Sequence, residues 1–142
     1  MKREILFRSK RTDNEEWVYG YLIGNNVIVG EVVDFEEDYF STEFWYKVNP
    51  ETVGQFTGFT DKNGTKVFEG GIIKAPSGRL YVVIWSTWIH DEKRNKFLTD
   101  RYEFTGWCIS KDGINPRDTL DCETLKGEVI GNIYDNPELI KP

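Results

Sequence analysis

Residues 49–74 contain closely spaced turn signals that limit the folds open to this chain: NPETVGQFTGFTDKNGTKVFEGGIIK. Asn49 before Pro50 predicts a capped helical turn, since Asn accepts bonds from free amides and Pro lacks the amide that would stay unpaired. Gly54 is expected to close this turn. Asp61 to Gly64 predicts a hairpin turn, because Asp favours the first turn position and Asn-Gly tolerates positive φ. A chain reversed this often is expected to form short antiparallel strands.

Strands are also indicated by composition, because 15% of the residues are aromatic and large rings with β-branched neighbours suit pleated surfaces. Asp34–Asp38, Asp91–Lys96 and Lys111–Lys126 are polar and are predicted as loops. The expected strands cover residues 3–8, 17–23, 27–33, 44–48, 72–75, 80–89, 97–109 and 129–134.

The predicted fold class is mainly β, with several antiparallel hairpins and one short helical turn near residues 50–54. Glu69-Gly70-Gly71-Ile72-Ile73, a turn and the strand from Leu80 resemble the first strands of a small SH3-like barrel. We therefore expect a single domain over residues 1–142. Its parts are N-terminal hairpins (1–48), a hinge and hairpin (49–71) and a barrel-like portion (72–139).

Three segments of the chain resemble the YopX family of phage and prophage proteins. They are the run from Pro50 to Gly70, the tail from Glu128 to Leu139, and the opening Arg3–Arg8 with Trp17–Gly20. The resemblance implies a mainly β, self-associating protein of phage origin without an established biochemical role, and it supplies no active-site residues. One departure is Gly71, where family members usually carry Asp, so any shared role of that carboxylate is absent here.

Charge is distributed unevenly along the chain. The net charge is −6, yet residues 1–11 carry a net +4 from five cations and Glu4. This basic segment is either an edge strand protected against aggregation or a patch for an anionic partner. Its candidate interaction residues are Lys2, Arg3, Arg8, Lys10 and Arg11.

Motifs that carry chemistry are missing from the sequence. His90 is the single histidine, and it is expected on a solvent-exposed loop. Cys108 and Cys122 lack zinc-ligand spacing and are expected to be reduced thiols. The cluster Asp34–Asp38 lacks the ligand pattern of a calcium loop. We therefore expect no catalytic site, no metal and no cofactor.

Tryptophans are the remaining candidates for an interaction surface. Strand alternation places Trp85 and Trp88 on opposite faces, so one of them has to leave the interior unless a second layer covers it. With Trp107 they could anchor a partner or stack on bases. A self-association interface would also cover them, since such interfaces concentrate aromatics.

These observations lead to three alternative hypotheses for the function. The leading hypothesis is a non-enzymatic phage or prophage accessory protein that works as a homo-oligomeric binding or assembly module. The alternative is a nucleic-acid-binding regulator that uses the basic N-terminal strand and exposed tryptophans, although the overall acidity disfavours it. A hydrolase using carboxylates and a divalent cation is a third possibility. Without an apolar run of about 20 residues or a signal segment, the expected location is the cytoplasm of a bacterial host, with no membrane partner.

Overall fold

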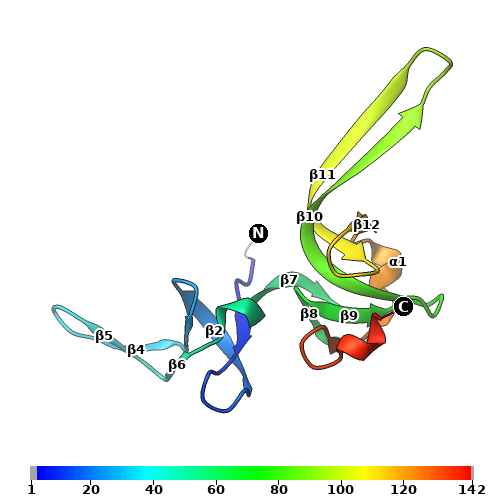
Figure 1. Cartoon of the computed structure of the whole chain (residues 1–142). Coiled ribbons are helices and arrows are strands. Elements are labelled where there is room, and N and C mark those ends of the chain that lie inside the picture. The colour runs from blue at the N-terminus through cyan, green and yellow to red at the C-terminus, as the bar shows by residue number, and fades with distance from the viewer. Residues whose placement is uncertain (1–2, 142) are drawn as a thin grey trace. The chain divides into compact units, whose positions relative to one another are not determined.

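The structure is a computed structural model that describes residues 3–141 (Figure 1). It confirms the mainly β class, with antiparallel strands, two 3-10 turns and one short α-helix in the described residues. The chain divides into two compact units, Met1–Gly58 (unit 1) and Phe59–Pro142 (unit 2). Among residues 3–141 no helix has the length and apolar character needed to cross a bilayer.

Unit 1 is built on one antiparallel sheet. Phe7 and Ser9 of the first strand point to its inner face, where the buried side chains of Val18, Ile28 and Val48 form the core. The strands follow the order β6-β3-β2-β1-β7, with β1 Phe7–Lys10, β2 Trp17–Ile23, β3 Val27–Val29, β6 Trp45–Lys47 and β7 Gly54–Thr60.

Gly20 allows two strands of this sheet to approach closely. A Cβ atom at Gly20 would lie 2.2 Å from the carbonyl oxygen of Val29, which no side chain tolerates. The prediction of a close backbone approach at this glycine is therefore confirmed.

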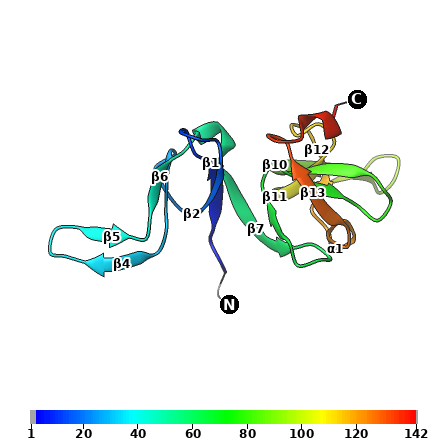
Figure 2. The same cartoon turned by 90° about the horizontal axis from the view of Figure 1, so that it is seen from below.

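The predicted strand over residues 27–33 is confirmed only in part, because the chain leaves the sheet at Gly30, after β3, and a separate strand begins at Val32. The Gly30 amide donates to the carbonyl of Phe44 at 3.0 Å, and a Cβ at Gly30 would lie 2.7 Å from the Phe44 ring. The segment then forms a separate two-stranded arm of β4 (Val32–Phe35) and β5 (Phe40–Thr42), which projects from the sheet of unit 1 (Figure 2). Asp34 and Phe35 are thus in a strand and not in the predicted acidic loop.

The predicted helical turn is present as the 3-10 turn η1 (Pro50–Thr52). Asn49 Oδ1 accepts a 3.0 Å bond from the amide of Glu51, as the Asn-Pro sequence indicated. The turn ends at Val53, however, and Gly54 begins β7 instead of closing the helix. Extended backbone at Val53 returns the chain directly to the sheet.

Unit 2 is an open five-stranded antiparallel sheet. Its core contains Val67, Ile73 and Val83, with a second cluster around Tyr81 and Ile109. No strand pairing in the described residues joins the two edge strands, so the predicted barrel is not closed. The order is β12-β11-β10-β9-β13, with β9 Gly71–Lys74, β10 Leu80–Lys93, β11 Thr99–Ser110, β12 Pro116–Thr119 and β13 Glu128–Asn132. A further strand, β8 (Lys66–Phe68), forms a hairpin with the end of β7.

The predicted loop at residues 91–96 is confirmed only for residues 94–96, because β10 and β11 remain paired as far as Lys93 and Thr99. Twelve consecutive pairs, from Val82 opposite Ser110 outward, produce a hairpin that extends well beyond the rest of unit 2 (Figure 1). The ion pair between Asp91 and Arg101, at 2.8 Å, lies across this ladder.

The predicted loop over residues 111–126 also contains regular structure. Pro116 opens the edge strand β12, a position where its missing amide costs no ladder bond. Asp121 then caps the helix α1 (Cys122–Leu125) by accepting a 2.8 Å bond from the Thr124 amide. Both cysteines are free thiols, Cys108 buried and Cys122 exposed.

Candidate interaction surfaces

The basic N-terminal strand places two cations on one aromatic ring. Arg8 and Lys10 share the outer face of β1, with the Arg8 guanidinium carbon 4.8 Å and Lys10 Nζ 5.5 Å from the centre of the Trp17 ring. Such cation–π contacts hold the charges against the sheet. Arg3 is exposed before the strand, and Lys2 lies outside the described residues.

Arg11 is engaged separately from these two cations. Its guanidinium lies 3.8 Å from the Tyr46 ring centre and makes two hydrogen bonds to the Asp13 carboxylate, at 2.6 and 2.9 Å. This pairing raises the pKa of Arg11 and lowers the pKa of Asp13. Arg11 and Lys10 line a pocket of about 320 Å³ together with Lys47.

The outer face of the unit 1 sheet also exposes aromatic rings that the sequence did not single out. The strand register puts Tyr19, Tyr21 and Trp45 on the same face as Arg8 and Lys10. Their exposed fractions are 46%, 42% and 67%. The alternation in WVYGYLI could have predicted this exposed aromatic face, because every second residue of β2 from Trp17 is apolar or aromatic and points outward.

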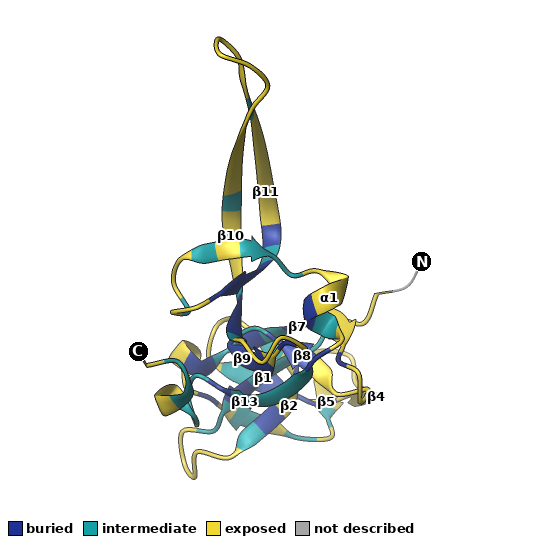
Figure 3. Ribbon diagram, turned by 90° about the vertical axis from the view of Figure 1, so that its right-hand side faces the viewer, coloured by how far each residue is buried: buried dark blue, intermediate teal, exposed yellow. Residues whose placement is uncertain are grey.

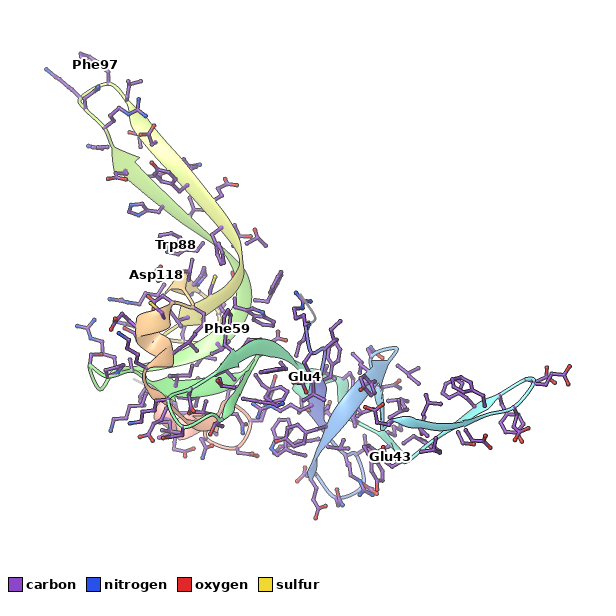
Figure 4. The ribbon with its side chains drawn as sticks, turned by 180° about the vertical axis from the view of Figure 1, so that it is seen from behind. Glu4, Glu43, Phe59, Trp88, Phe97 and Asp118 are labelled. Carbon is purple, nitrogen blue, oxygen red and sulfur yellow. The ribbon has the colours of Figure 1, made fainter. Side chains whose placement is uncertain are left out.

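The three predicted tryptophans of unit 2 do not form one surface. Trp85 and Trp107 are opposite each other on β10 and β11, with ring centres 5.0 Å apart and planes at 80°. Trp107 packs partly against the core, whereas Trp85 is 57% exposed. Trp88 is on the other face, as alternation predicted, and its Nε1 donates to the carbonyl of Arg117 at 2.8 Å (Figure 4 shows it directed toward Asp118 of β12).

His90 is on strand β10 and not on the predicted loop. Its ring stacks on Trp88, with centres 5.4 Å apart and planes at 7°, and lies 6.4 Å from Tyr102 on its other side. The histidine is therefore one member of an exposed aromatic row. No group of three or more His, Cys, Asp or Glu residues among positions 3–141 is placed to hold a metal ion.

Two hairpin arms carry most of the exposed apolar side chains. We call residues 84–104 of β10 and β11 the long arm; Figure 3 shows it exposed along most of its length, above a buried base. Phe97 at its tip is 87% exposed, and Figure 4 shows its side chain directed away from the protein. The exposed apolar residues of the long arm are Trp85, Ile89, Phe97, Leu98, Tyr102 and Phe104.

We call residues 31–43, which contain β4 and β5, the acidic arm. They hold six carboxylates and no lysine or arginine. Phe35 and Tyr39 flank the turn, which is closed by the Glu36 amide donating to the Tyr39 carbonyl at 2.8 Å. These two rings are 76% and 65% exposed, so the arm presents aromatic and acidic groups together.

A pocket of about 610 Å³ in unit 2 is rimmed by cations. We call it the cationic pocket. Its floor is apolar and includes the buried ring of Tyr81, and its one acidic residue is Asp112. The charged side chains on the rim come from four segments of the chain: Arg79, Lys111, Arg117 and Lys141.

Asp112 offsets only one of the four positive charges on this rim, and its own loop holds the carboxylate in place. Asp112 accepts bonds of 2.8 Å from the amides of Ile114 and Asn115 and from the Asn115 side chain, and 2.9 Å from the Ser110 hydroxyl. These donors hold the pKa of Asp112 far below its usual range. Within residues 3–141 none of the four rim cations forms a salt bridge.

Asp61 is the buried acid of unit 2, and its role is structural. Its carboxylate accepts bonds from the amides of Asn63, Thr65 and Val129, at 2.9, 2.9 and 2.8 Å. Burial raises the pKa of Asp61, but the three amides outweigh this and leave the pKa below its ordinary value. The acid fixes the predicted Asp61–Gly64 turn against β13.

Comparisons with known proteins agree with this architecture. A crystal structure of the protein EF1440 from Enterococcus faecalis has a similar fold, with a TM-score of 0.53, 20% identity, and coverage of 99% of this chain and 100% of that chain. No curated protein matches the sequence. The family model described as YopX protein matches residues 6–141, which include both the Asp61 turn and the C-terminal strand that it holds. The chain therefore belongs to the YopX family.

Proposed function

We propose that this protein is a non-enzymatic, homo-oligomeric assembly module of a phage or prophage. The observation that carries the proposal is the long arm, which leaves Ile89 and Tyr102 about half exposed on opposite faces of a two-stranded ribbon. An isolated two-stranded hairpin is only marginally stable in water, so an arm of this length gains stability when another surface covers it. Oligomer interfaces concentrate aromatics of this kind in their buried centres.

The charge of the long arm favours a second copy as the covering surface. Residues 90–103 contain four cations and four carboxylates, whereas the whole chain carries −6. Contacts between two copies through this arm therefore carry no net charge repulsion. We take the phage setting, and with it a bacterial cytoplasm, from the family resemblance.

Light-scattering mass tests this function. At about 50 μM, where a specific complex with a micromolar Kd is mostly assembled, we expect a defined multimer at low and moderate salt. The variant Ile89→Thr with Tyr102→Thr keeps β propensity but removes apolar area, and we expect it to lower the mass. Glu103→Gln, directly opposite Ile89, is the matched control and should leave the mass unchanged. A wild-type protein that is a monomer at this concentration would contradict the proposal.

A second candidate function is nucleic-acid binding by the outer face of unit 1. Arg8 and Lys10 over Trp17, beside the exposed rings of Tyr19 and Tyr21, combine cations and stacking surfaces as single-strand binders do. A gel shift with single-stranded DNA at low salt tests this candidate, since electrostatic binding is strongest there. Lys10→Gln should weaken the shift; unchanged mobility of the wild type at low salt would remove the candidate.

A further inference from the structure

The acidic arm and the cationic pocket are complementary in charge, and both also carry apolar side chains. The arm presents a narrow turn with Glu36 and Glu37 beside two exposed rings, and the pocket presents a cationic rim above an apolar floor. A volume of about 610 Å³ is within the range of sites that enclose a ligand of several side chains. We propose that the acidic arm of one copy docks into the cationic pocket of a second copy.

The location of the charges supports a second copy as the occupant. From Thr12 to Tyr46 the chain contains no lysine or arginine. The acidic arm alone holds six carboxylates, and the net charge of the whole chain is −6. A surface with this charge requires a cationic partner if it is to be covered. The rim cations of unit 2 satisfy this requirement, because they form no salt bridge in the described residues and Asp112 offsets only one of their four charges.

Apolar contacts also match. Phe35 and Tyr39 are among the most exposed aromatic side chains of unit 1, and their rings would meet Leu80 and Leu139 on the pocket floor. Burial of a large aromatic side chain contributes more to affinity than a solvated ion pair does. The rings thus provide affinity, and the charges select the partner surface.

This contact is heterologous, because the arm and the pocket are different surfaces of the same chain. Heterologous contacts produce a ring when the rotation closes and an open assembly when it does not. The inference rests on the proposed function, since it names a second contact of the oligomer beside the long arm.

Charge reversal tests the docking. We expect the pocket variant Arg79→Glu with Lys111→Glu and the arm variant Glu36→Lys with Glu37→Lys each to weaken association at least tenfold, measured by light-scattering mass over a dilution series. All four side chains are exposed, so the variants should fold, and circular dichroism with a thermal melt checks this. The neutral variants Arg79→Gln with Lys111→Gln should weaken association less than the reversal does.

Mixing the two reversed variants is the decisive step. The arm variant changes the charge of the turn at residues 36–38 from −3 to +1, and the pocket variant changes the charge of the pocket lining from +3 to −1. Each variant alone therefore has a turn and a pocket of like charge. In an equimolar mixture the basic turn of one variant matches the acidic pocket of the other, and the remaining turn and pocket keep the natural charges. We therefore expect the mixture to recover the wild-type mass. Recovery requires contact between different molecules, since neither variant is complementary within itself.

Three results would overturn the inference. The first is an unchanged mass in both reversed variants. The second is a mixture that stays as dissociated as its components. The third is a wild-type gel shift with single-stranded DNA that the pocket variant loses while it keeps the wild-type mass. An assembled wild type that depends on the long arm but ignores the charge reversals would leave the proposed function intact. A monomeric wild type would contradict the proposed function itself, so the two failures are distinguishable.

Discussion

The carboxylate of Asp61 accepts a 2.8 Å hydrogen bond from the amide of Val129, 68 residues further along the chain. The same carboxylate holds the turn in which Asp61 lies, through the amides of Asn63 and Thr65. One buried side chain therefore joins two of the sequence segments that resemble the YopX family, the run from Pro50 to Gly70 and the tail from Glu128 to Leu139.

Removing this carboxylate should destabilise unit 2 strongly. We expect Asp61→Ala to lower the free energy of unfolding by about 3 kcal/mol, because it leaves buried amides without an acceptor and each charge-assisted bond contributes about 1.5–3 kcal/mol. Urea unfolding followed by circular dichroism measures the change. Asp38→Ala, at the exposed turn of the acidic arm, is the control and should cost less than about 0.5 kcal/mol. Equal costs for the two variants would contradict the role of Asp61.

The stabilisation by Asp61 should depend on pH. Since the pKa of Asp61 is lower in the folded chain than in the unfolded chain, its contribution is complete above the unfolded value, about 3.9, and is lost as the pH falls toward the folded value. The difference in unfolding free energy between the wild type and Asp61→Asn should therefore shrink from pH 7 to pH 3. Asp112 also has a lowered pKa, but both proteins contain it, so its effect cancels. A difference that is constant over this range would refute the prediction.

Thr52 should be as important for unit 1 as Asp61 is for unit 2. Its hydroxyl accepts the Lys10 amide at 2.9 Å and shares a 2.7 Å bond with the buried hydroxyl of Ser9. Thr52→Val keeps the shape but leaves both groups without this partner, so we expect a loss of about 2 kcal/mol. Thr12→Val, at an exposed threonine, is the matched control with an expected cost below about 0.5 kcal/mol. Thermal melts of both variants provide the comparison.

Gly20→Ala should be poorly tolerated, because the added Cβ would meet the Val29 carbonyl of the neighbouring strand. Overpacking of this kind costs about 3 kcal/mol when the backbone has to move. Gly78→Ala is the comparison: its φ of +89° is strained for alanine, but no atom lies within 4 Å of the new Cβ. That variant should cost about 1–2 kcal/mol, and a larger loss at Gly78 than at Gly20 would show that the strand approach is not the constraint.

Thiol chemistry distinguishes the two cysteines. Cys108 is fully buried, and burial raises the pKa of its thiol, whereas Cys122 is exposed at the start of α1. We expect one thiol per folded chain to react rapidly with a disulfide reagent and the second to react only after denaturant is added. The absorbance of the released thiolate gives the count, and Cys122→Ser should abolish the rapid phase.

Local turn chemistry made part of this fold predictable from the sequence. Asn49-Pro50 and Asp61–Gly64 specify their backbone through bonds to neighbouring residues, so their geometry is set within a few positions. The end of β10 could not be predicted in this way. Asp91, Glu92 and Lys93 are charged on both faces and resemble a loop, and only pairing with Thr99–Arg101 makes them a strand.

The interaction surfaces were likewise predictable where local sequence sets them and not where long-range strand pairing does. The face-to-face position of Trp85 and Trp107 depends on strand register, although the alternation within β10 correctly separated Trp85 from Trp88. The cationic pocket was not predicted because Arg79, Lys111 and Lys141 are far apart in the sequence and meet only through the order of the sheet. Gly71 stands where the sequence comparison expected an aspartate. A Cβ atom at this position would lie 2.9 Å from the Phe68 carbonyl oxygen, which is too close for a side chain without a local shift.

The long arm also bears on how the protein avoids fibre formation. Toward its tip β10 and β11 pair only with each other, so each strand has a backbone edge that another chain could extend. Charged side chains on a strand edge oppose such extension. This stretch of β10 carries Asp91, Glu92 and Lys93 in succession, and on β11 Arg101 lies opposite Asp91 and Asp100 opposite Glu92. These residues thus act as gatekeepers: they leave the aromatic faces of the arm available for ordered contacts while they block the uncontrolled strand addition that leads to amyloid.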